Sequence, residues 1–390
     1  MYPSTVKEIS GIFVHEQAIE LVKHGCEIKI ISPVPWVPFP INWMNAKWKA
    51  YSQIPSRTII DGIDIYYPRY LAFPRAMFFA SSGRRMYRGI KRLVDKIYHE
   101  FPFDLIHAHV VLPNGYAAML VNKRYNKSLV VTIHGQDLQV TFYKNIKCER
   151  ALARVFKKSD KIITVSTKLK NMARENFGFS EKIIMLNNGV NTKKLVVGKS
   201  NLASNYVDYK IILSVSNLIA SKGVDLNLKA ISRLVKKHSN LKYVVIGDGP
   251  EINNLKKLTF QLNLENNVEF LGGSPHDKVM DYMAIANVFS LPSWREGFGI
   301  VYLEAMAHGK PVIGCIGEGI EDVIENGTTG FLVRTKDLDS LFEAIDFLLS
   351  NPEECKTMGE RARELVLKNY TWQKNAEKIL EIYHELIEKL

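Results

Sequence analysis

What this sequence lacks excludes several classes of protein. No run of about 18 apolar residues occurs, so no segment is predicted to cross a membrane as a helix. The first residues show no basic stretch followed by an apolar one, so no secretory signal is predicted. No C-x-x-C pair occurs among Cys26, Cys148, Cys315 and Cys355, and we therefore expect reduced, buried thiols rather than a disulfide scaffold or a zinc site.

Composition and charge point to a globular protein with an anionic partner. The chain has 390 residues, of which 46% are hydrophobic and 24% are charged. That length suits two domains of roughly 150–200 residues each. Residues 1–190 carry 28 basic and 14 acidic side chains, whereas residues 191–390 carry 24 and 26. The positive excess therefore lies in the first half, which indicates that this half meets a phosphorylated substrate, a nucleic acid or an acidic membrane.

Short β-rich runs alternate with helical patterns along the whole chain, and this alternation predicts parallel sheets with crossover helices. The expected strands are Glu27–Ser32, Leu105–His109, Val130–His134, Lys161–Val165, Ile183–Leu186, Lys210–Ser216, Tyr243–Ile246, Val268–Leu271, Val288–Leu291 and Val312–Cys315. The expected helices include Phe13–His24, Gly115–Tyr125, Lys168–Phe177, Asp225–Lys237, Glu251–Leu262, Asp277–Ala284 and Val301–His308.

A polar, aperiodic stretch, Asn191–Tyr209, separates two series of these elements. We therefore expect an α/β protein of two doubly wound, Rossmann-like domains that face a cleft, with boundaries at 1–195 and 206–371. The amphipathic helix at 372–390 is expected to pack back on the first domain.

The first domain has no strand before its first helix. Ser10-Gly11 followed by Phe13–His24 has the form of a strand-to-helix loop with its helix, but the strand itself is missing. A sheet without an inner strand would leave unpaired backbone groups in its interior. We therefore expect that the natural gene product begins upstream of Met1 and supplies about ten further residues.

The strongest chemical signal is the segment from Glu296 to Ala307. Glu296 lies before Gly297-Phe298-Gly299, and Glu304 lies about two turns into the helix that follows. Glycines let backbone amides approach a ligand, and a helix start favours a diphosphate. The two carboxylates can contact two ends of an extended ligand.

This segment resembles the E-x7-E motif of the retaining glycosyltransferases of family 4, which have the GT-B fold. Further landmarks in the family's order extend the resemblance over nearly the whole chain. They are Ser10–Glu16, Asp104–His109, Thr132–Asp137, Asn188–Asn191, Ser221–Asp225, Gly247–Pro250, Phe270–Gly272 and Asn326–Gly330.

The resemblance assigns roles in donor binding. Glu296 is expected to hold hydroxyls of the donor sugar, and Glu304 is expected to hold the ribose. Lys222 would neutralise the leaving diphosphate as a flexible point charge. The remaining donor contacts are expected from the amides of Gly297, Phe298, Gly299, Ser10 and Gly11, and from Gly272 and Lys278 near the base.

On the acceptor side, the resemblance places His134 at the reacting carbon. His107 and His109 are expected to have a packing or an acceptor-side role, and Asp137 is expected on the acceptor side. Many family members have an arginine five residues before the lysine of the Lys-Gly pair, but this chain has Asn217 there. The two-cation grip on the diphosphate is therefore in doubt, although an enzyme of surface-polysaccharide synthesis resembling those of teichuronic acid is still expected.

The first half contains a basic and aromatic stretch. From Ile65 to Val94 no acidic residue occurs, while Arg84, Arg85 and Arg88 lie among aromatic side chains. This composition suits an anionic membrane surface, a single-stranded nucleic acid or simply a solvated face. With the enzyme reading, membrane binding near a lipid-linked acceptor is favoured over nucleic acid.

The function predicted is a retaining transfer of a sugar from a nucleotide sugar, expected to be a UDP-sugar, to a glycan or lipid-linked acceptor. The enzyme is expected to need no metal or other cofactor and to lie in the cytoplasm at the membrane's inner face. The alternatives are a nucleotide-sugar epimerase, a glycan phosphorylase, or a catalytically impaired membrane-associated partner. A dinucleotide oxidoreductase is disfavoured because Gly247-Asp248-Gly249 lacks the third glycine of G-x-G-x-x-G.

Overall fold

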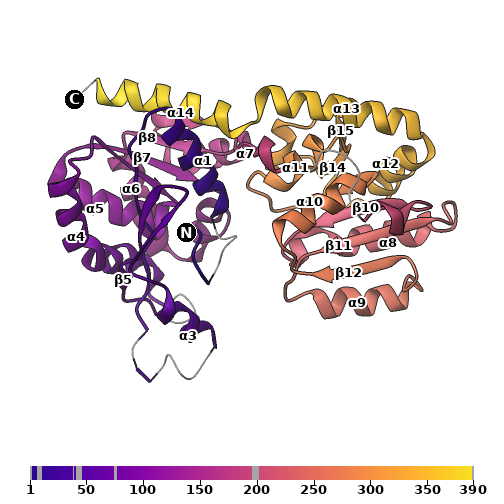
Figure 1. The fold of residues 1–390 in the computed structure, drawn as a ribbon, viewed down its shortest axis with the longest axis horizontal. Helices are drawn as coiled ribbons and strands as arrows, with labels where there is room; N and C mark the ends of the chain where they lie inside the picture. Colours follow the sequence, from indigo (N-terminus) through magenta and orange to yellow (C-terminus); the bar gives the residue numbers. More distant parts are fainter. Residues whose placement is uncertain are drawn as a thin grey trace. The chain divides into compact units, whose positions relative to one another are not determined.

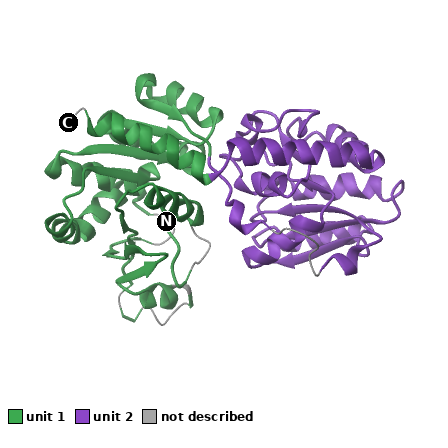
Figure 2. Ribbon diagram, turned by 45° about the horizontal axis from the view of Figure 1, so that its top comes forward, with its two compact units in different colours: residues 1–187, 372–390 green, residues 188–371 purple. Residues whose placement is uncertain are grey.

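The computed structural model describes residues 2–6, 11–37, 39–40, 46–73, 77–195 and 202–388. The chain divides into two compact units, shown in Figure 2. Unit 1 comprises residues 1–187 and 372–390, and unit 2 comprises residues 188–371. In the described part of the chain, no helix is both long enough and apolar enough to span a bilayer.

Unit 2 is built around a six-stranded, all-parallel sheet (Figure 1). Its spatial order is β12-β11-β10-β13-β14-β15, which is the 3-2-1-4-5-6 order of a Rossmann sheet. The strands are β10 (Lys210–Val215), β11 (Leu241–Ile246), β12 (Val268–Gly272), β13 (Val288–Ser290), β14 (Val312–Cys315) and β15 (Gly330–Val333). The helices are α8 (Val224–Leu234), α9 (Ile252–Gln261), α10 (His276–Ile285), α11 (Ile300–Ala307), α12 (Leu338–Ser350) and α13 (Pro352–Asn369). This order puts the switch point between β10 and β13, where ligands bind at strand carboxyl ends.

Unit 1 contains two larger sheets. The four parallel strands β6 (Leu105–His109), β7 (Ser128–Ile133), β8 (Lys161–Thr164) and β9 (Ile183–Met185) form one of them in sequence order. The other has the order β1-β4-β3, from β1 (Lys29–Ile31), β4 (Ile63–Tyr66) and β3 (Arg57–Ile60). β1 runs parallel to β4, and β3 is antiparallel to β4. A short parallel pair joins β2 (Val34–Pro35) to β5 (Arg69–Tyr70).

The helices of unit 1 form where apolar residues recur at helical spacing. α4 (Ser82–Glu100) buries Met86, Ile90, Val94 and Ile97 and exposes most of its basic side chains. The strand β7 is buried along its whole length, in keeping with its continuous apolar sequence. The other helices are α1 (Ile12–Lys23), α3 (Ala46–Gln53), α5 (Tyr116–Tyr125), α6 (Ile146–Lys158), α7 (Thr167–Phe177) and α14 (Trp372–Ile387).

The C-terminal helix α14 completes the core of unit 1. Its side chains Ala376, Ile379, Ile382 and Leu386 join one cluster with Leu21 of α1, Val130 of β7 and Ile163 of β8. Figure 1 shows α14 alongside α1 and above β7 and β8. The chain thus leaves unit 1 after Asn187 and returns to it at Trp372.

The expected α/β architecture of two units built on parallel sheets is confirmed, with two differences in unit 1. The antiparallel hairpin of β3 and β4 was not predicted. Its turn at Asp61-Gly62 has positive φ angles of 49° and 78°. The parallel strands that the sequence predicts as one sheet form two separate sheets, with β1 and β6 at the edges where an inner strand would join them.

Candidate functional site

The site in unit 2 begins with the turn after β10. Residues Ala220–Lys222 form a short 3-10 turn, and Gly223 follows with a φ of 70° before α8 starts. A side chain at Gly223 would place its Cβ 2.4 Å from the carbonyl oxygen of Pro292. Only glycine lets the Lys222 turn lie against the segment that follows β13.

That segment carries the first motif glutamate. The backbone amide of Trp294 donates to the carbonyl of Ser221 at 2.9 Å, and the Ser293 hydroxyl donates to the same oxygen at 3.1 Å. Gly299, with a φ of 88°, then turns the chain into α11. These contacts tie the loops after β10 and β13 together at the switch point of the sheet.

Lys222 and Glu296 form an ion pair across these two loops. The ammonium group of Lys222 donates to Oε2 of Glu296, and the two side chains are 16% and 14% exposed. The backbone amide of Glu296 also donates to Oε2 of Glu318 at 2.7 Å. Glu296 is therefore held from both sides just before α11, by Lys222 at its carboxylate and by Glu318 at its backbone amide.

The second motif glutamate has its own cationic partner. Glu304 lies on α11, and its Oε1 is 2.8 Å from Nε2 of His276, the first residue of α10. This hydrogen bond raises the pKa of His276, while Nδ1 of the same ring is buried without a partner in the described structure. A protonated His276 would leave Nδ1–H as a donor with nothing to bind, so the ring has capacity for a ligand oxygen.

The other predicted donor residues of unit 2 lie after strands of the sheet or at helix starts. Gly272 ends β12 with a φ of 67° and open space around it, and Lys278 is exposed on the first turn of α10. Asn217 is exposed after β10, whereas Phe298 is 2% exposed and packs inward. Phe298 can therefore contribute through its backbone amide, while its ring holds the loop in place.

Two residues of this site, His276 and Glu318, were not predicted from the sequence as site residues. His276 follows Pro275 at the start of a helix, a position where a histidine has no special meaning without its partner. Glu318 lies 22 residues after Glu296, and no spacing rule connects the two. Only the folded chain shows that each contacts a motif glutamate.

A pair of aspartates with D-x-D spacing, Asp337-Leu338-Asp339, plays a structural part. Oδ1 of Asp337 accepts the amides of Asp339 and Ser340, each at 3.1 Å, and so caps α12. Asp339 pairs with Arg233 at 2.6 Å. Among the residues that the structure describes, no group of three or more His, Cys, Asp and Glu side chains could hold a metal ion.

Unit 1 carries a cluster of three histidines at the carboxyl ends of β6 and β7. Nδ1 of His109 lies 3.0 Å from Nε2 of His134, and the rings of His107 and His109 stack at 4.5 Å. His107 is held between the Tyr383 hydroxyl at 2.5 Å and the Thr132 hydroxyl at 2.7 Å. Burial lowers the pKa of His107 to about 4 and that of His134 to about 3, and it lowers the pKa of His109 well below its usual value. The cluster is therefore neutral at pH 7.

The remaining predicted residues of unit 1 are Ser10, Gly11 and Asp137. Ser10 lies outside the described residues, and Gly11 caps α1 with a φ of 76°. Oδ1 of Asp137 accepts the amides of Val111 and Leu112 at 3.1 and 3.3 Å, while its buried Oδ2 has no described partner. Burial raises the pKa of Asp137 to about 7. Asp137 thus orders the loop after β6, which gives it a positioning role in this unit.

The buried histidines predict a loss of stability in mild acid. Their pKa values are lower in the folded chain than the unfolded value of about 6.5, so the unfolded chain binds more protons between pH 6.5 and 4. The contribution of these histidines to the free energy of unfolding is fully present above pH 6.5, and it falls as the pH drops through that window. Asp137 opposes this trend because its folded pKa is raised.

Differential scanning calorimetry between pH 7.5 and 5 tests this expectation. The melting temperature of the transition of unit 1 should fall with pH, and it should fall more steeply in Asp137→Asn, which removes the opposing titration. A flat profile in both proteins would show that the histidines are charged in the folded state.

The three arginines predicted to meet a membrane differ in exposure and in their hydrogen bonds. Arg84 and Arg88 are exposed on α4. Arg85 donates to the carbonyls of Leu71 and Phe78 at 2.9 and 3.2 Å and lies over the ring of Phe73 at 4.9 Å. Arg85 thus fastens the preceding loop to α4.

Two family models together match most of the chain. Residues 10–194 match Glycosyltransferase Family 4, and residues 203–365 match Glycosyl transferases group 1. An uncharacterized glycosyltransferase of Methanocaldococcus jannaschii is 31% identical over 308 residues, which are 77% of this chain and 83% of the relative. The putative teichuronic acid biosynthesis glycosyltransferase TuaC of Bacillus subtilis is 29% identical over 352 residues, covering 88% and 86%.

Solved structures share the architecture at low sequence identity. Sucrose-phosphate synthase from Thermosynechococcus elongatus superposes with a TM-score of 0.81 at 20% identity, covering 98% of this chain and 94% of the other. Anabaena HepE, solved in complex with UDP, gives a TM-score of 0.74 at 18% identity and 96% coverage of both chains. The chain therefore belongs to glycosyltransferase family 4, and its two units form a GT-B fold.

Proposed function

We propose that this chain is a retaining glycosyltransferase that takes a sugar from a UDP-sugar and passes it to a glycan or lipid-linked acceptor of a cell-surface polysaccharide. Unit 2 binds the donor, and no metal ion takes part. The observation that carries the proposal is the Lys222–Glu296 ion pair beside the start of α11, at the switch point of a Rossmann sheet.

The ion pair suits a donor that has both a diphosphate and a sugar. A diphosphate offers Lys222 a stronger partner than one carboxylate, and the N-terminus of α11 adds its dipole. When Lys222 turns to the phosphate, the Glu296 carboxylate can accept hydroxyl hydrogen bonds from the sugar. As the bond to the diphosphate breaks, negative charge grows on the leaving group, and Lys222 stabilises that charge.

The pair of Glu304 and His276 suits the nucleoside. Glu304 can accept two ribose hydroxyls through its carboxylate while Nε2 of His276 fixes its orientation. These contacts are the same in the ground and transition states, so they act on donor affinity rather than on turnover. A UDP donor is supported by HepE, which was solved with UDP and with UDP-glucose.

Titration calorimetry with UDP-glucose, GDP-mannose and ADP-glucose tests the donor. UDP-glucose should bind, and Glu304→Ala should weaken it while leaving the melting temperature of the free protein near that of the parent. Transfer should persist in EDTA. Inversion of one carbon of the sugar within the nucleotide sugar, without an acceptor, would indicate an epimerase. Release of a sugar phosphate from glycan and inorganic phosphate would indicate a phosphorylase. Binding of no nucleotide sugar would contradict the proposal.

Asn217→Arg should strengthen the grip on the diphosphate. Asn217 is exposed after β10, five residues before Lys222, and has no charge to offer. A charge-assisted hydrogen bond contributes about 1.5–3 kcal/mol, so affinity for UDP should rise roughly tenfold or more. Asn217→Gln is the matched control because it lengthens the side chain without a charge. Equal affinities for the arginine and glutamine variants would show that this position lies away from the phosphates.

We also propose that the exposed face of α4 attaches the enzyme to an anionic membrane. Arg88, Lys91 and Arg92 are exposed there, and Met77 and Phe78 in the preceding loop are 53% and 66% exposed. Each basic residue near such a surface contributes about 1 kcal/mol. Co-sedimentation with phosphatidylserine vesicles should fall when all three basic residues become serine, and it should weaken as salt rises.

The control for this membrane experiment changes the same number of charges elsewhere in unit 1. Lys147, Lys157 and Lys158 are exposed on α6, and their replacement by serine should leave vesicle binding close to that of the parent. Arg85 is kept in both variants because it holds the loop of Leu71 and Phe78. Equal losses in both variants would mean that net charge, and not this helix face, governs attachment.

A further inference from the structure

Two arginines from different helices of unit 1 meet at one tyrosine hydroxyl. Tyr116 is the first residue of α5 and is 4% exposed. Nη1 of Arg154, on α6, donates to its hydroxyl oxygen at 3.4 Å. Arg84, in the first turn of α4, hydrogen bonds the same hydroxyl. Burial raises the pKa of Tyr116, but the hydrogen bonds from the two arginines outweigh it, and the pKa lies below its usual value.

Backbone packing brings the two arginines together. A Cβ at Gly83, next to Arg84, would lie 2.6 Å from the Cβ of Tyr116, so only glycine lets α4 come this close. A Cβ at Gly115 would lie 3.2 Å from Cγ1 of Val155, next to Arg154, so the start of α5 also fits tightly against α6. Figure 1 shows α4, α5 and α6 side by side in unit 1. The convergence is therefore built into the helix packing.

The positive charge at this junction is not balanced. Arg84 and Arg154 are both exposed, and neither pairs with a carboxylate in the part of the chain that the structure describes. The arginines that form ion pairs there are Arg57, Arg124, Arg233 and Arg361. The first turns of α4 and α5 hold no acidic residue, although a helix start stabilises one. Lys144, just before α6, adds a cation 5.0 Å from the ring of Phe79, just before α4. An anion at the junction would relieve the repulsion.

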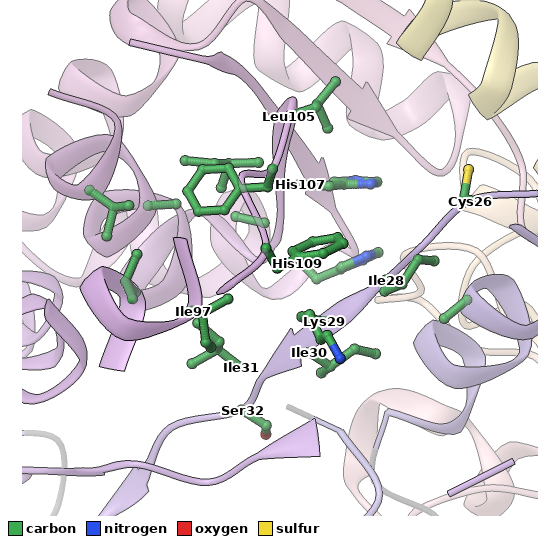
Figure 3. A pocket seen from close by; sticks show the side chains of 18 of the residues that line it. Cys26, Ile28, Lys29, Ile30, Ile31, Ser32, Ile97, Leu105, His107 and His109 are labelled. Atoms are coloured by element: carbon green, nitrogen blue, oxygen red, sulfur yellow. The ribbon is translucent and has the colours of Figure 1, made fainter. Parts of the chain in front are cut away.

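The junction belongs to the loop that follows β6. Figure 3 shows His107 and His109 on β6, at the wall of a cavity of about 850 Å³ in unit 1. From His109 the chain runs through residues 110–115 to Tyr116, and the Asn114 side chain donates to the carbonyl of His109 at 2.8 Å. Ligands of α/β proteins bind at the carboxyl ends of the strands, and this loop starts there.

We propose that Arg84, Arg154 and Tyr116 form a binding site for a phosphate group, separate from the donor site of unit 2. The planar fork of each guanidinium can donate two hydrogen bonds to phosphate oxygens, and the Tyr116 hydroxyl can donate a further one. Phosphate suits the junction better than a carboxylate because it offers more oxygen atoms and more charge to three converging donors. The ligand is a phosphate ester, either of a soluble molecule or of a lipid headgroup. This proposal does not depend on the identity of the sugar donor.

NMR titration of protein labelled with ¹³C at the tyrosine Cζ atoms tests the site. The signal of Tyr116 is the one that Tyr116→Phe lacks. Glycerol 3-phosphate should shift this signal, whereas glycerol should leave it in place. Arg84→Gln and Arg154→Gln should each raise the apparent Kd at least ~10-fold, because each removes a charge-assisted hydrogen bond. Arg174→Gln is the matched control, since Arg174 is exposed on α7 away from this junction, and its Kd should equal that of the parent.

Co-sedimentation with phosphatidic acid vesicles separates the two sources of the phosphate. A lipid headgroup as ligand requires that Arg84→Gln and Arg154→Gln reduce sedimentation while Arg174→Gln does not. A soluble ester requires that glycerol 3-phosphate shifts the Tyr116 signal and that the three variants sediment alike. The proposal is overturned if glycerol 3-phosphate leaves the signal in place and the vesicles bind all three variants equally. It is also overturned if Arg174→Gln raises the Kd as much as the other two variants, because overall charge would then explain the binding.

Discussion

Replacement of Glu296 by glutamine should lower kcat about 1000-fold while unit 2 keeps its fold. Removing one group that meets developing charge or the reacting sugar typically costs 100- to 1000-fold in turnover. Glutamine keeps the shape of the side chain but leaves the Lys222 ammonium without its carboxylate partner. The Lys222 side chain is only 16% exposed in the parent protein. Steady-state kinetics at saturating donor measure the loss, and circular dichroism checks the fold.

The matched control is Glu265→Gln, an exposed glutamate in the turn after α9, which should leave kcat unchanged. A double variant that adds Lys222→Met shows whether the pair acts as a unit. If it does, the double variant should be no slower than Glu296→Gln alone, because one change already disables the pair. A kcat within threefold of the parent for Glu296→Gln would remove Glu296 from the active site.

Gly319→Ala should destabilise unit 2 by about 3 kcal/mol, at the upper end of what overpacking costs. A Cβ at Gly319 would lie 2.2 Å from the carbonyl oxygen of Gly297 and 2.8 Å from the Cα of Phe298. Both neighbours are backbone atoms of the motif loop, so they cannot move aside as a flexible side chain would. The loop must shift, and Glu296, one residue earlier, shifts with it. Donor affinity should therefore fall together with stability.

Gly273→Ala provides the control, because the space around that glycine is open and its φ is not positive. Urea unfolding of both variants gives the two free energies, and calorimetric titration with UDP gives the affinities. A loss for Gly319→Ala no greater than for Gly273→Ala would show that the 297–299 loop has room to relax.

The fold of unit 2 could be predicted almost strand by strand from the sequence. Its strands are short apolar runs with a turn residue after each one, and Lys210–Val215 and Val312–Cys315 fall within one residue of their predicted bounds. β15 was missed because Gly330–Val333 is too short and glycine-led to stand out. Unit 1 was harder, since the two strands of the β3–β4 hairpin have only four residues each, too few for a periodic pattern to stand out.

The site was predicted only as far as local patterns reach. The helix start after Gly299 and the placement of Glu304 within α11 follow from a run of adjacent residues, and the structure has both. The partners of the two glutamates depend on chain segments far away in sequence, such as His276 for Glu304 and Glu318 for Glu296. No local spacing encodes such contacts. The roles of His134 and of the three arginines stay predictions, and the structure adds that Arg85 also holds its own loop.

The return of the chain to unit 1 bears on the order in which the units can fold during synthesis. All of unit 2 is contiguous in sequence, and its two ends meet where Val190 bridges Thr371. The points where the chain leaves and re-enters unit 1 also lie together, because the Asn375 side chain donates to the carbonyl of Asn187 at 2.7 Å. Unit 1, however, lacks Ile379, Ile382 and Leu386 until the last residues are made. Although it is begun first, unit 1 is finished last, and a ribosome that stops shortly after Thr371 releases a complete unit 2 attached to an open apolar surface.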